Sequence, residues 1–228
     1  MSEKGSLRNS SGVETLDITE IAGADELYHA RGIIRESEQN AARLFGAART
    51  LYSAEGSSLC IRAMAYLALL RARRLGLPAR LLAGRNAHKT LMTAAALLDI
   101  EIDWLWPDAA DGLLRCTPDA AQVEARLDEH AYMGVFITSP DYLGNRAQVR
   151  ALAEACHRRG VPLLVDNAHG AYLRFLPQGQ HPLTLGADLC CDSAHKTLPC
   201  LTGAAYLHIG PGAPREFADQ AEQALAMF

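Results

Sequence analysis

The chain has 228 residues, of which 49% are hydrophobic and 21% are charged, and its formal net charge at pH 7 is −4. This composition is typical of a globular domain with a hydrophobic core. The slightly acidic balance gives no reason to expect nucleic acid or an anionic membrane surface as a partner. No apolar run reaches the ~18–20 residues that span a bilayer, so we expect no membrane segment. The polar start, MSEKGSLRNSSG, lacks the apolar core of a signal peptide, and we expect residues 1–16 to be a disordered lead-in.

The cysteines show no spacing typical of a disulfide framework or a metal site. There are six, with no CxxC pair: Cys60, Cys116, Cys156, Cys190, Cys191 and Cys200. Several lie in apolar segments, where an unpaired thiol behaves as a small hydrophobic side chain. We therefore expect no metal site and no structural disulfide, and a reducing compartment, the cytoplasm.

The hydrophobic pattern alternates between helices and short apolar strands. An amphipathic helix is predicted over residues 33–46, and Gly46 marks its end. A short strand over residues 51–53 precedes a helix over residues 59–75, which Gly76 and a proline stop. Further apolar runs predict buried strands over residues 79–83, 100–104, 134–138, 162–166, 189–192 and 204–209.

Local signals also predict where the later helices begin. Thr117 is expected to be an N-cap, because a proline and an acidic residue follow it. Asn145 with Gln148 resembles a capping box for the next helix. A last helical pattern covers residues 216–227.

Continuous apolar strands separated by helices predict an α/β fold with three α/β/α layers and a mostly parallel seven-stranded sheet. In such sheets, ligands bind beyond the carboxyl ends of the strands. Polar and titratable residues collect at those positions in this sequence: Gly56-Ser57-Ser58, residues 85–89, residues 138–140, Asp166 to His169, and Ser193 to Lys196. This concentration is the main chemical signal in the chain.

Gly56-Ser57-Ser58 at the start of a predicted helix is suited to holding a phosphate. A helix N-terminus offers unpaired N–H groups and a partial positive charge, and two hydroxyls add donors. The same residues also fit an ordinary serine N-cap. No Walker lysine follows and no GxGxxG is present, so the nucleotide-binding motifs are excluded.

Asp166 ends one apolar strand and Lys196 follows another. Because burying an unpaired carboxylate is costly, Asp166 is expected to bind a metal, pair with a cation or cap a turn. A lysine after a buried strand can lose its proton by desolvation and become a nucleophile, although Lys196 alone fits a surface lysine equally well. His88 and His169 also follow strands, and either alone fits an ordinary hydrogen-bonded histidine.

Longer motifs in the chain resemble those of the ornithine/lysine/arginine (Orn/Lys/Arg) decarboxylase family. The run LLVDNAHGAYLRF is followed by SAHKTLP, and the matching segments ADELYHARGIIRESEQNAARLFGA, EGSS, GRNAHKT and ITSPDYLGN precede them. Together the segments cover most of residues 17–210 in the family's order. The combination is specific, whereas no single segment is. The family consists of fold-type-I enzymes that use pyridoxal 5′-phosphate (PLP) and are related to the aminotransferases.

The resemblance implies roles for individual residues. The implied catalytic residues are Lys196, which would form the Schiff base with PLP, Asp166, which would pair with the pyridine nitrogen, and His88, which would stack on the ring. The implied cofactor-binding residues are Gly56, Ser57, Ser58, His88, Asp166, Ala168, His169, Ser193, His195 and Lys196. Ala168 would pack on the other ring face, and the serines with His195 would hold the phosphate. Asn167 stands where the family often has Glu or Ala, and Asp141 stands where the family often has Thr. The change at Asp141 is expected to affect substrate contacts.

The family's activity implies decarboxylation of lysine, ornithine or arginine to its amine, as in polyamine metabolism, by a homodimer or higher homo-oligomer. The residues alone leave open an aminotransferase or another fold-type-I activity, and also a cofactor-binding fragment without turnover. The family continues beyond the point where this chain stops. We therefore expect residues 17–228 to form the PLP-binding large domain of a truncated chain, without the C-terminal small domain and without a complete active site.

Overall fold

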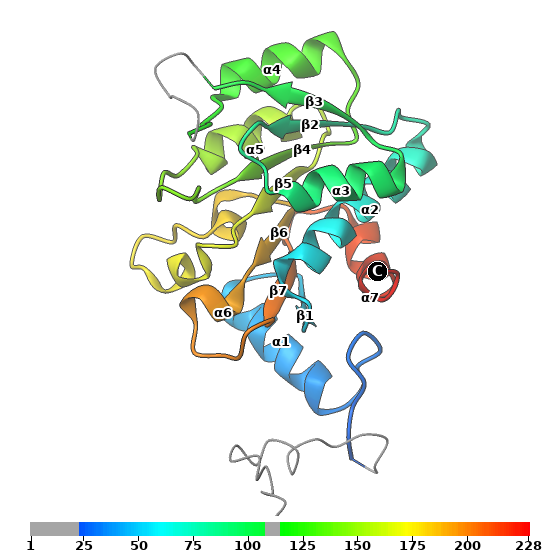
Figure 1. Cartoon of the computed structure of the whole chain (residues 1–228), viewed down its shortest axis with the longest axis vertical. Helices are drawn as coiled ribbons and strands as arrows, with labels where there is room; N and C mark the ends of the chain where they lie inside the picture. Colours follow the sequence, from blue (N-terminus) through cyan, green and yellow to red (C-terminus); the bar gives the residue numbers. More distant parts are fainter. Residues whose placement is uncertain (1–22, 108–114) are drawn as a thin grey trace, which may run out of the picture.

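The computed structural model describes residues 23–107 and 115–228 (Figure 1), so the predicted lead-in, residues 1–16, lies outside the described residues. The strands are β1 (Arg49–Ser53), β2 (Arg80–Gly84), β3 (Glu101–Leu105), β4 (Gly134–Thr138), β5 (Leu163–Asp166), β6 (Leu189–Asp192) and β7 (Ala205–Ile209). The α-helices are α1 (Ile33–Phe45), α2 (Gly56–Leu75), α3 (Lys89–Leu98), α4 (Ala120–Glu129), α5 (Val149–His157), α6 (Ala194–Thr197) and α7 (Arg215–Ala226). Two short 3-10 helices are η2 (Ala171–Phe175) and η3 (Pro182–Leu185).

The seven strands form one sheet in the order β1-β7-β6-β5-β4-β2-β3. Strand β7 is antiparallel to both of its neighbours, β1 and β6, whereas the other adjacent pairs are parallel. The prediction of a mostly parallel seven-stranded sheet is confirmed. Because β1, β2, β4, β5 and β6 run in the same direction, the segments that follow them all begin at one edge of the sheet.

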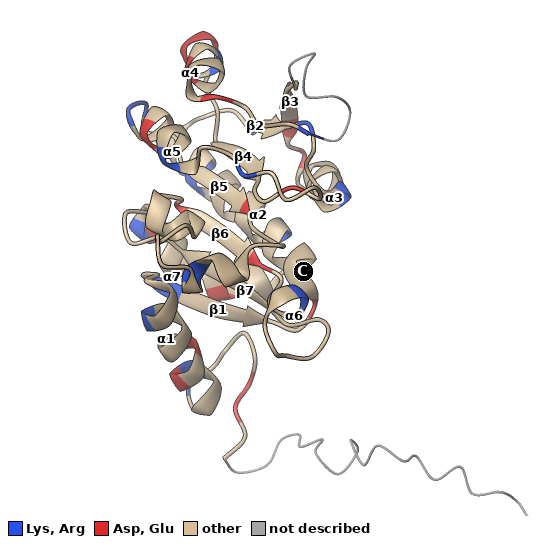
Figure 2. Ribbon diagram, turned by 90° about the vertical axis from the view of Figure 1, so that its left-hand side faces the viewer, with Lys and Arg blue, Asp and Glu red and all other residues tan. Residues whose placement is uncertain are grey.

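Helices cover both faces of the sheet, which explains why the strands are apolar throughout. Helices α2, α3 and α7 pack together on one face, and α4, α5 and α1 lie on the other (Figures 1 and 2). All five residues of β4 are buried, as a strand covered on both sides requires. The three predicted α/β/α layers are therefore present.

The predicted helix ends are confirmed more often than the predicted helix starts. Helices α1 and α2 end at Gly46 and Gly76, whose φ angles of 73° and 67° lie in the left-handed region that glycine adopts without strain. Helix α4 begins later than predicted, because Asp119 is its N-cap and accepts a hydrogen bond from the Gln122 N–H at 2.7 Å. The prediction of Thr117 as N-cap is wrong, since the nearer carboxylate takes that role.

The predicted capping box before α5 is also wrong. Asn145 donates from Nδ2 to the Asp141 carboxylate at 2.9 Å and so stabilises the preceding loop. Gln148 occupies the N-cap position of α5 without a side-chain cap bond. A spacing of three residues suggested the box, but the acid at position 141 competes for the Asn145 amide.

Two observations concern the setting of the chain. None of the helices in the described residues combines the length and apolar character needed to cross a membrane. No disulfide joins any of the six cysteines, all of which lie in the described residues, and five of them are buried.

The packing of α2 on the sheet predicts a large effect of truncating its core. Leu67 is 0% exposed, whereas Leu97 on α3 is 64% exposed. We expect Leu67→Ala to lower the free energy of unfolding by ~2–5 kcal/mol, because it removes buried methyl groups and leaves a cavity. The matched surface variant Leu97→Ala is expected to stay within ~0.5 kcal/mol of the parent. Urea unfolding of both variants measures the difference, and equal destabilisation would contradict this description of the core.

Candidate functional site

All ten predicted cofactor-binding residues line one pocket at the carboxyl edge of the sheet. The pocket has a volume of about 180 Å³ and is also lined by Thr138 and Tyr142, which lie in the ITSPDYLGN segment but were not among the predicted site residues. Its walls come from the segments after β1, β2, β4, β5 and β6, so residues more than a hundred positions apart in the chain meet there. The volume lies below the ~300–1,000 Å³ of most small-molecule sites, so these side chains form part of the wall of such a site.

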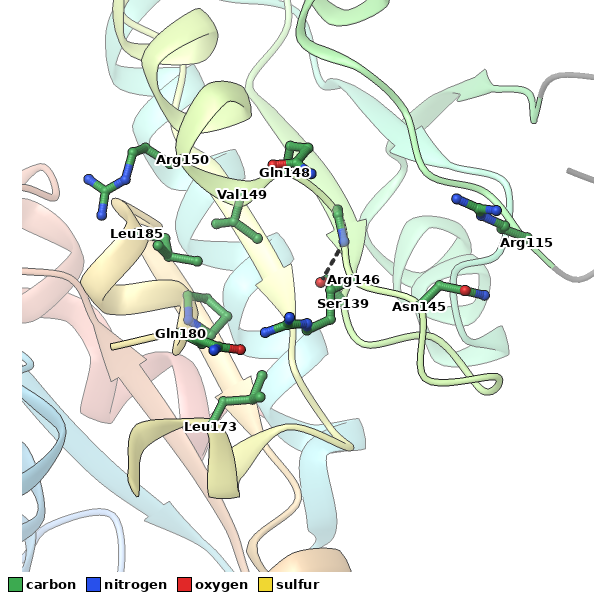
Figure 3. A pocket seen from close by; sticks show the side chains of 12 residues that line it. Arg115, Ser139, Asn145, Arg146, Gln148, Val149, Arg150, Leu173, Gln180 and Leu185 are labelled. Carbon is green, nitrogen blue, oxygen red and sulfur yellow. Dashed lines mark hydrogen bonds between the residues drawn. The ribbon is translucent and has the colours of Figure 1, made fainter. Parts of the chain in front are cut away.

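A larger cavity lies beside this pocket and contains none of the ten predicted residues. It has a volume of about 570 Å³ and lies between the loop after β4, the start of α5 and the segment around Gln180 (Figure 3). The Ser139 hydroxyl at its centre accepts a hydrogen bond from the Ala147 N–H at 3.0 Å. We place the candidate site in the smaller pocket, because only there do a buried carboxylate, a lysine amine and histidines converge.

The start of α2 forms one end of the pocket and is suited to an anion. Gly56 has a φ of 70°, and Ser57 and Ser58 follow it in the first turn, where backbone N–H groups have no partner within the helix. The N-cap is Glu55, without a side-chain cap bond, so the alternative of an ordinary serine N-cap is wrong. The Ser193 hydroxyl, from the segment after β6, donates to Ser57 Oγ at 2.7 Å. Hydroxyls from two segments thus meet at a helix N-terminus.

His88 is fixed by the first turn of α3, of which it is the N-cap. Its Nδ1 accepts from the Thr90 N–H at 3.3 Å and lies 2.8 Å from Thr90 Oγ1. The Thr90 hydroxyl in turn donates to Ser58 Oγ at 3.2 Å. Thr90 therefore connects the imidazole to the anion-binding end of the pocket. Sequence reasoning missed this residue, although its position two residues after an N-cap is a recognisable signal.

Asp166 is the most deeply buried ionisable group of the pocket, with 2% of its surface exposed. Its Oδ1 accepts from the Ala168 N–H at 3.1 Å and from the Cys191 thiol at 3.6 Å. Within the described residues, no donor reaches Oδ2. Burial raises the pKa of Asp166, and the hydrogen bonds from Ala168 and Cys191 offset this only in part. A carboxylate held in this way is stabilised as an anion only when a cation lies against it.

Lys196 lies in the single turn of α6 and reaches His169. The Nζ of Lys196 lies 3.3 Å from His169 Nε2, and the Tyr142 ring packs against the imidazole with centroids 5.1 Å apart. Burial, and then the nearby lysine, lowers the pKa of His169, which favours its neutral ring. Of the two alternatives that the sequence left open for Lys196, a desolvated or a surface lysine, the structure shows the second, because the side chain is exposed to solvent.

The remaining predicted residues lie at the edge of the pocket or behind it. His195 contacts the Ala204 carbonyl with Nδ1 at 3.0 Å, which leaves its other nitrogen toward the pocket it lines. Asp141 is buried and accepts from the backbone N–H groups of Leu143 and Asn145. Its carboxylate thus faces its own loop, and the expected effect of Asp141 on substrate contacts stays a prediction. Asn167 faces away from the pocket, toward the core.

Curated relatives match most of the chain. The uncharacterized protein YaaO of Bacillus subtilis strain 168 is 34% identical over 198 residues, which are 86% of this chain and 40% of that protein. An arginine decarboxylase of Halalkalibacterium halodurans is 32% identical over 204 residues, which are 87% of this chain and 40% of the relative. The chain therefore spans about 40% of the length of these relatives.

Solved structures show the same fold at lower identity. A putative L-allo-threonine aldolase from Listeria monocytogenes has a TM-score of 0.68 at 16% identity, covering 94% of this chain and 57% of that one. A structure of Oryza sativa TDC with PLP has a TM-score of 0.64 at 16% identity, covering 85% of this chain and 50% of that one. These are fold-type-I PLP enzymes, which agrees with the predicted fold.

The family comparison covers nearly the whole chain. The model of the Orn/Lys/Arg decarboxylase major domain matches residues 11–227. This match, together with the PLP-bound structural neighbours, indicates PLP as the cofactor. With a pocket at the carboxyl edge of the sheet that gathers all ten predicted cofactor-binding residues, the chain belongs to the Orn/Lys/Arg decarboxylase family.

Proposed function

We propose that this chain carries the PLP-binding large domain, residues 17–228, of an enzyme that decarboxylates a basic amino acid: lysine, ornithine or arginine. The observation that supports the proposal most is the gathering of ten residues from separate segments around one pocket. Relatives named arginine decarboxylase, at 30–32% identity, support a basic amino acid as the substrate class. The activity is proposed for the protein as a whole, since the chain spans only part of those relatives.

The residues of the pocket fit PLP in three ways. The Oδ2 of the buried Asp166 suits the protonated ring nitrogen, because among the described residues no side chain forms an ion pair or a hydrogen bond with it. The start of α2 and its serines suit the phosphate. The Lys196 amine suits the aldehyde. When bound, PLP draws electrons away from the carbon that loses its carboxylate.

The side chains then have separable tasks. Lys196 holds the cofactor and releases it to the substrate amine, and His169, at 3.3 Å, accepts a hydrogen bond from Nζ and so directs the amine. His88 and Ala168 would hold the ring between them. Asp166, as an anion, would keep the ring nitrogen protonated, which would be electrostatic stabilisation supplied before the reaction begins.

We further propose that the protein acts as a homodimer or higher homo-oligomer in the cytoplasm, within polyamine metabolism. Three apolar side chains near the pocket support a second subunit that covers them, because large exposed apolar groups favour association. They are Leu201, Tyr142 and Leu143, with 87%, 66% and 62% of their surface exposed. The six cysteines without a disulfide support a reducing compartment.

Borohydride reduction with PLP tests the role of Lys196. The chain has three lysines, Lys4, Lys89 and Lys196, so the assignment is unambiguous. We expect the reduced cofactor on Lys196, because among residues 23–107 and 115–228 no other lysine lines the pocket. Peptide mapping by mass spectrometry locates the label, with Lys89→Arg as a control that leaves labelling unchanged and Lys196→Arg as the variant that loses it. A label on Lys89, or none, would contradict the assignment.

Asp166→Asn tests the pairing with the ring nitrogen. The amide keeps the size of the side chain but removes its charge, so it cannot hold a proton on the ring nitrogen. We expect PLP to remain bound while the decarboxylation rate falls roughly 10²-fold or more, the scale on which one electrostatic group contributes to catalysis. The control is Asp141→Asn, whose carboxylate faces its own loop. Near-normal turnover of Asp166→Asn would refute the pairing.

Product analysis tests the reaction type. With arginine, lysine and ornithine in turn, we expect release of carbon dioxide and the matching amine, measured with a ¹⁴C-carboxyl label. The chain and a form extended to the length of its relatives are both assayed, because the side chains of this pocket form only part of the wall of a small-molecule site. A keto acid as the product would identify an aminotransferase instead. PLP binding without any product in either form would leave a cofactor-binding protein.

A further inference from the structure

A buried hydrogen-bond network lies directly behind the pocket. Asp192, the last residue of β6, is 0% exposed, and its Oδ2 lies 3.0 Å from His181 Nε2 and 3.3 Å from His208 Nε2. Its Oδ1 accepts from Asn167 Nδ2 at 2.6 Å. On the far side, His208 Nδ1 lies 2.8 Å from the Thr50 hydroxyl. We call these five residues the Asp192 network.

The partners of each ring define the direction of the hydrogen bonds. His181 Nδ1 accepts from the Leu183 N–H at 3.4 Å, so its Nε2–H donates to Asp192. Burial lowers the pKa of His208, whose neutral ring donates from Nε2 and accepts from the Thr50 hydroxyl. Burial also acts on Asp192, but the facing histidines outweigh it, so the pKa of this carboxylate lies well below its ordinary value. The network therefore holds an anion deep in the core.

The network contacts both segments that carry the reactive groups. Asn167 lies between Asp166 and Ala168, and its N–H donates to the Cys191 carbonyl at 2.9 Å. Asp192 directly precedes Ser193 and lies four residues before Lys196. The bond between Asn167 and Asp192 thus joins the end of β5 to the end of β6. A core made of apolar side chains would have filled this space without an anion, so packing alone does not require it.

The space around Asn167 is tight, which makes its position well defined. Asn167 is 0% exposed, and its Oδ1 would lie 2.1 Å from a Cβ on Gly170. Pro140 Cδ would lie 2.7 Å from the same Cβ, so no larger residue fits at position 170 without displacing the amide. A small shift of Asn167 would therefore move its neighbour Asp166.

We infer that Asp192, through Asn167, His181 and His208, is a positioning residue that fixes the carboxylate of Asp166 relative to the Lys196 segment. The expected effect on PLP binding rests on the proposed function. The geometry of the network does not depend on that function. Supporting hydrogen bonds behind a site commonly decide how well its side chains are oriented.

A metal site is the competing explanation of the same residues. Ligand atoms of His181, Cys190 and Asp192 lie within 4.8 Å of one another. However, both imidazole N–H groups already donate to Asp192, and burial holds the pKa of the Cys190 thiol well above its ordinary value, which disfavours a thiolate ligand. The hydrogen-bonded anion accounts for these groups without an ion.

The test compares Asp192→Asn with a matched variant at the other end of the same strand. Asp188 is also buried, and it accepts from the Leu163 N–H and lies 2.8 Å from His157, but it is remote from the pocket. Asp188→Asn therefore removes an equivalent buried acid. Three quantities are measured for each purified chain: metal content, PLP affinity from visible absorbance, and hydrogen exchange of the peptides over residues 166–169 and 193–196 without cofactor.

A double variant that exchanges the hydrogen-bond donor Asn167 and the acceptor Asp192 tests whether the losses of the single variants can be recovered. In Asp192→Asn, a single carbonyl oxygen replaces two carboxylate oxygens and cannot accept from Asn167 and both histidines at once, whereas in Asn167→Asp two carboxylates face each other. The double variant Asn167→Asp with Asp192→Asn restores the donor and the acceptor in reversed positions and keeps the net charge. We expect each single variant to weaken PLP binding roughly tenfold or more, the scale reported for lost outer-shell partners in metal sites. Both are expected to accelerate exchange in the two peptides, and the double variant is expected to recover most of both losses.

Several outcomes would overturn the inference. They are an Asp192→Asn variant with parental affinity and exchange, an Asp188→Asn variant with the same losses in those peptides, no recovery in the double variant, or stoichiometric bound metal. If Asp192→Asn does not fold, Asn167→Ala replaces it, because it breaks the same bond but keeps the histidine partners of Asp192. If the parent chain binds no PLP, the proposed function fails, and the exchange measurements still decide the inference.

Discussion

The burial of Asp166 is the constraint on which the site depends. A carboxylate with 2% of its surface exposed and one unpartnered oxygen is costly to keep charged, and the fold supplies only an N–H and a thiol to the other oxygen. The protein therefore holds a group that gains stability when a cation binds beside it. In the proposed function, the protonated ring nitrogen of PLP would be that cation, and cofactor binding would then be coupled to the stability of the pocket.

The order of the strands explains how the other groups reach this carboxylate. Strand β7 lies between β1 and β6 and runs opposite to both, so its first residues and the loop before it lie at the same edge as the starts of α2 and α6. The Gly203 carbonyl accepts from the Gly56 N–H at 2.7 Å, which joins this loop to the start of α2 at one end of the pocket. Gly203 has a φ of 98°, and a Cβ there would lie 2.5 Å from the Ala54 carbonyl oxygen, so glycine is required. The same strand brings His208 beside Asp192.

The sequence predicted those features that depend on neighbouring residues. The strand at residues 134–138 was predicted with its observed bounds, and the residues after each strand were correctly placed at one edge, since parallel strands share a direction. The sequence left the exposure of Lys196 undecided, because a helix of a single turn, such as α6, has no periodicity that separates a buried from an exposed side chain. The Asp192 network has no local signal, because Thr50 and His208 are 158 residues apart and meet only through the sheet. A contact between residues so far apart in the chain produces no periodic pattern in the sequence from which it could be predicted.

The protonation state of the cofactor's ring nitrogen tests the central claim most directly. PLP labelled with ¹⁵N in the ring, bound to this chain and observed by NMR at neutral pH, reports whether that nitrogen carries a proton beside Asp166. The account predicts a protonated nitrogen with a resolved one-bond coupling to its hydrogen, because the buried carboxylate needs a cation. An unprotonated ring nitrogen in the bound cofactor would contradict the role assigned to Asp166 and, with it, the proposed chemistry of the site.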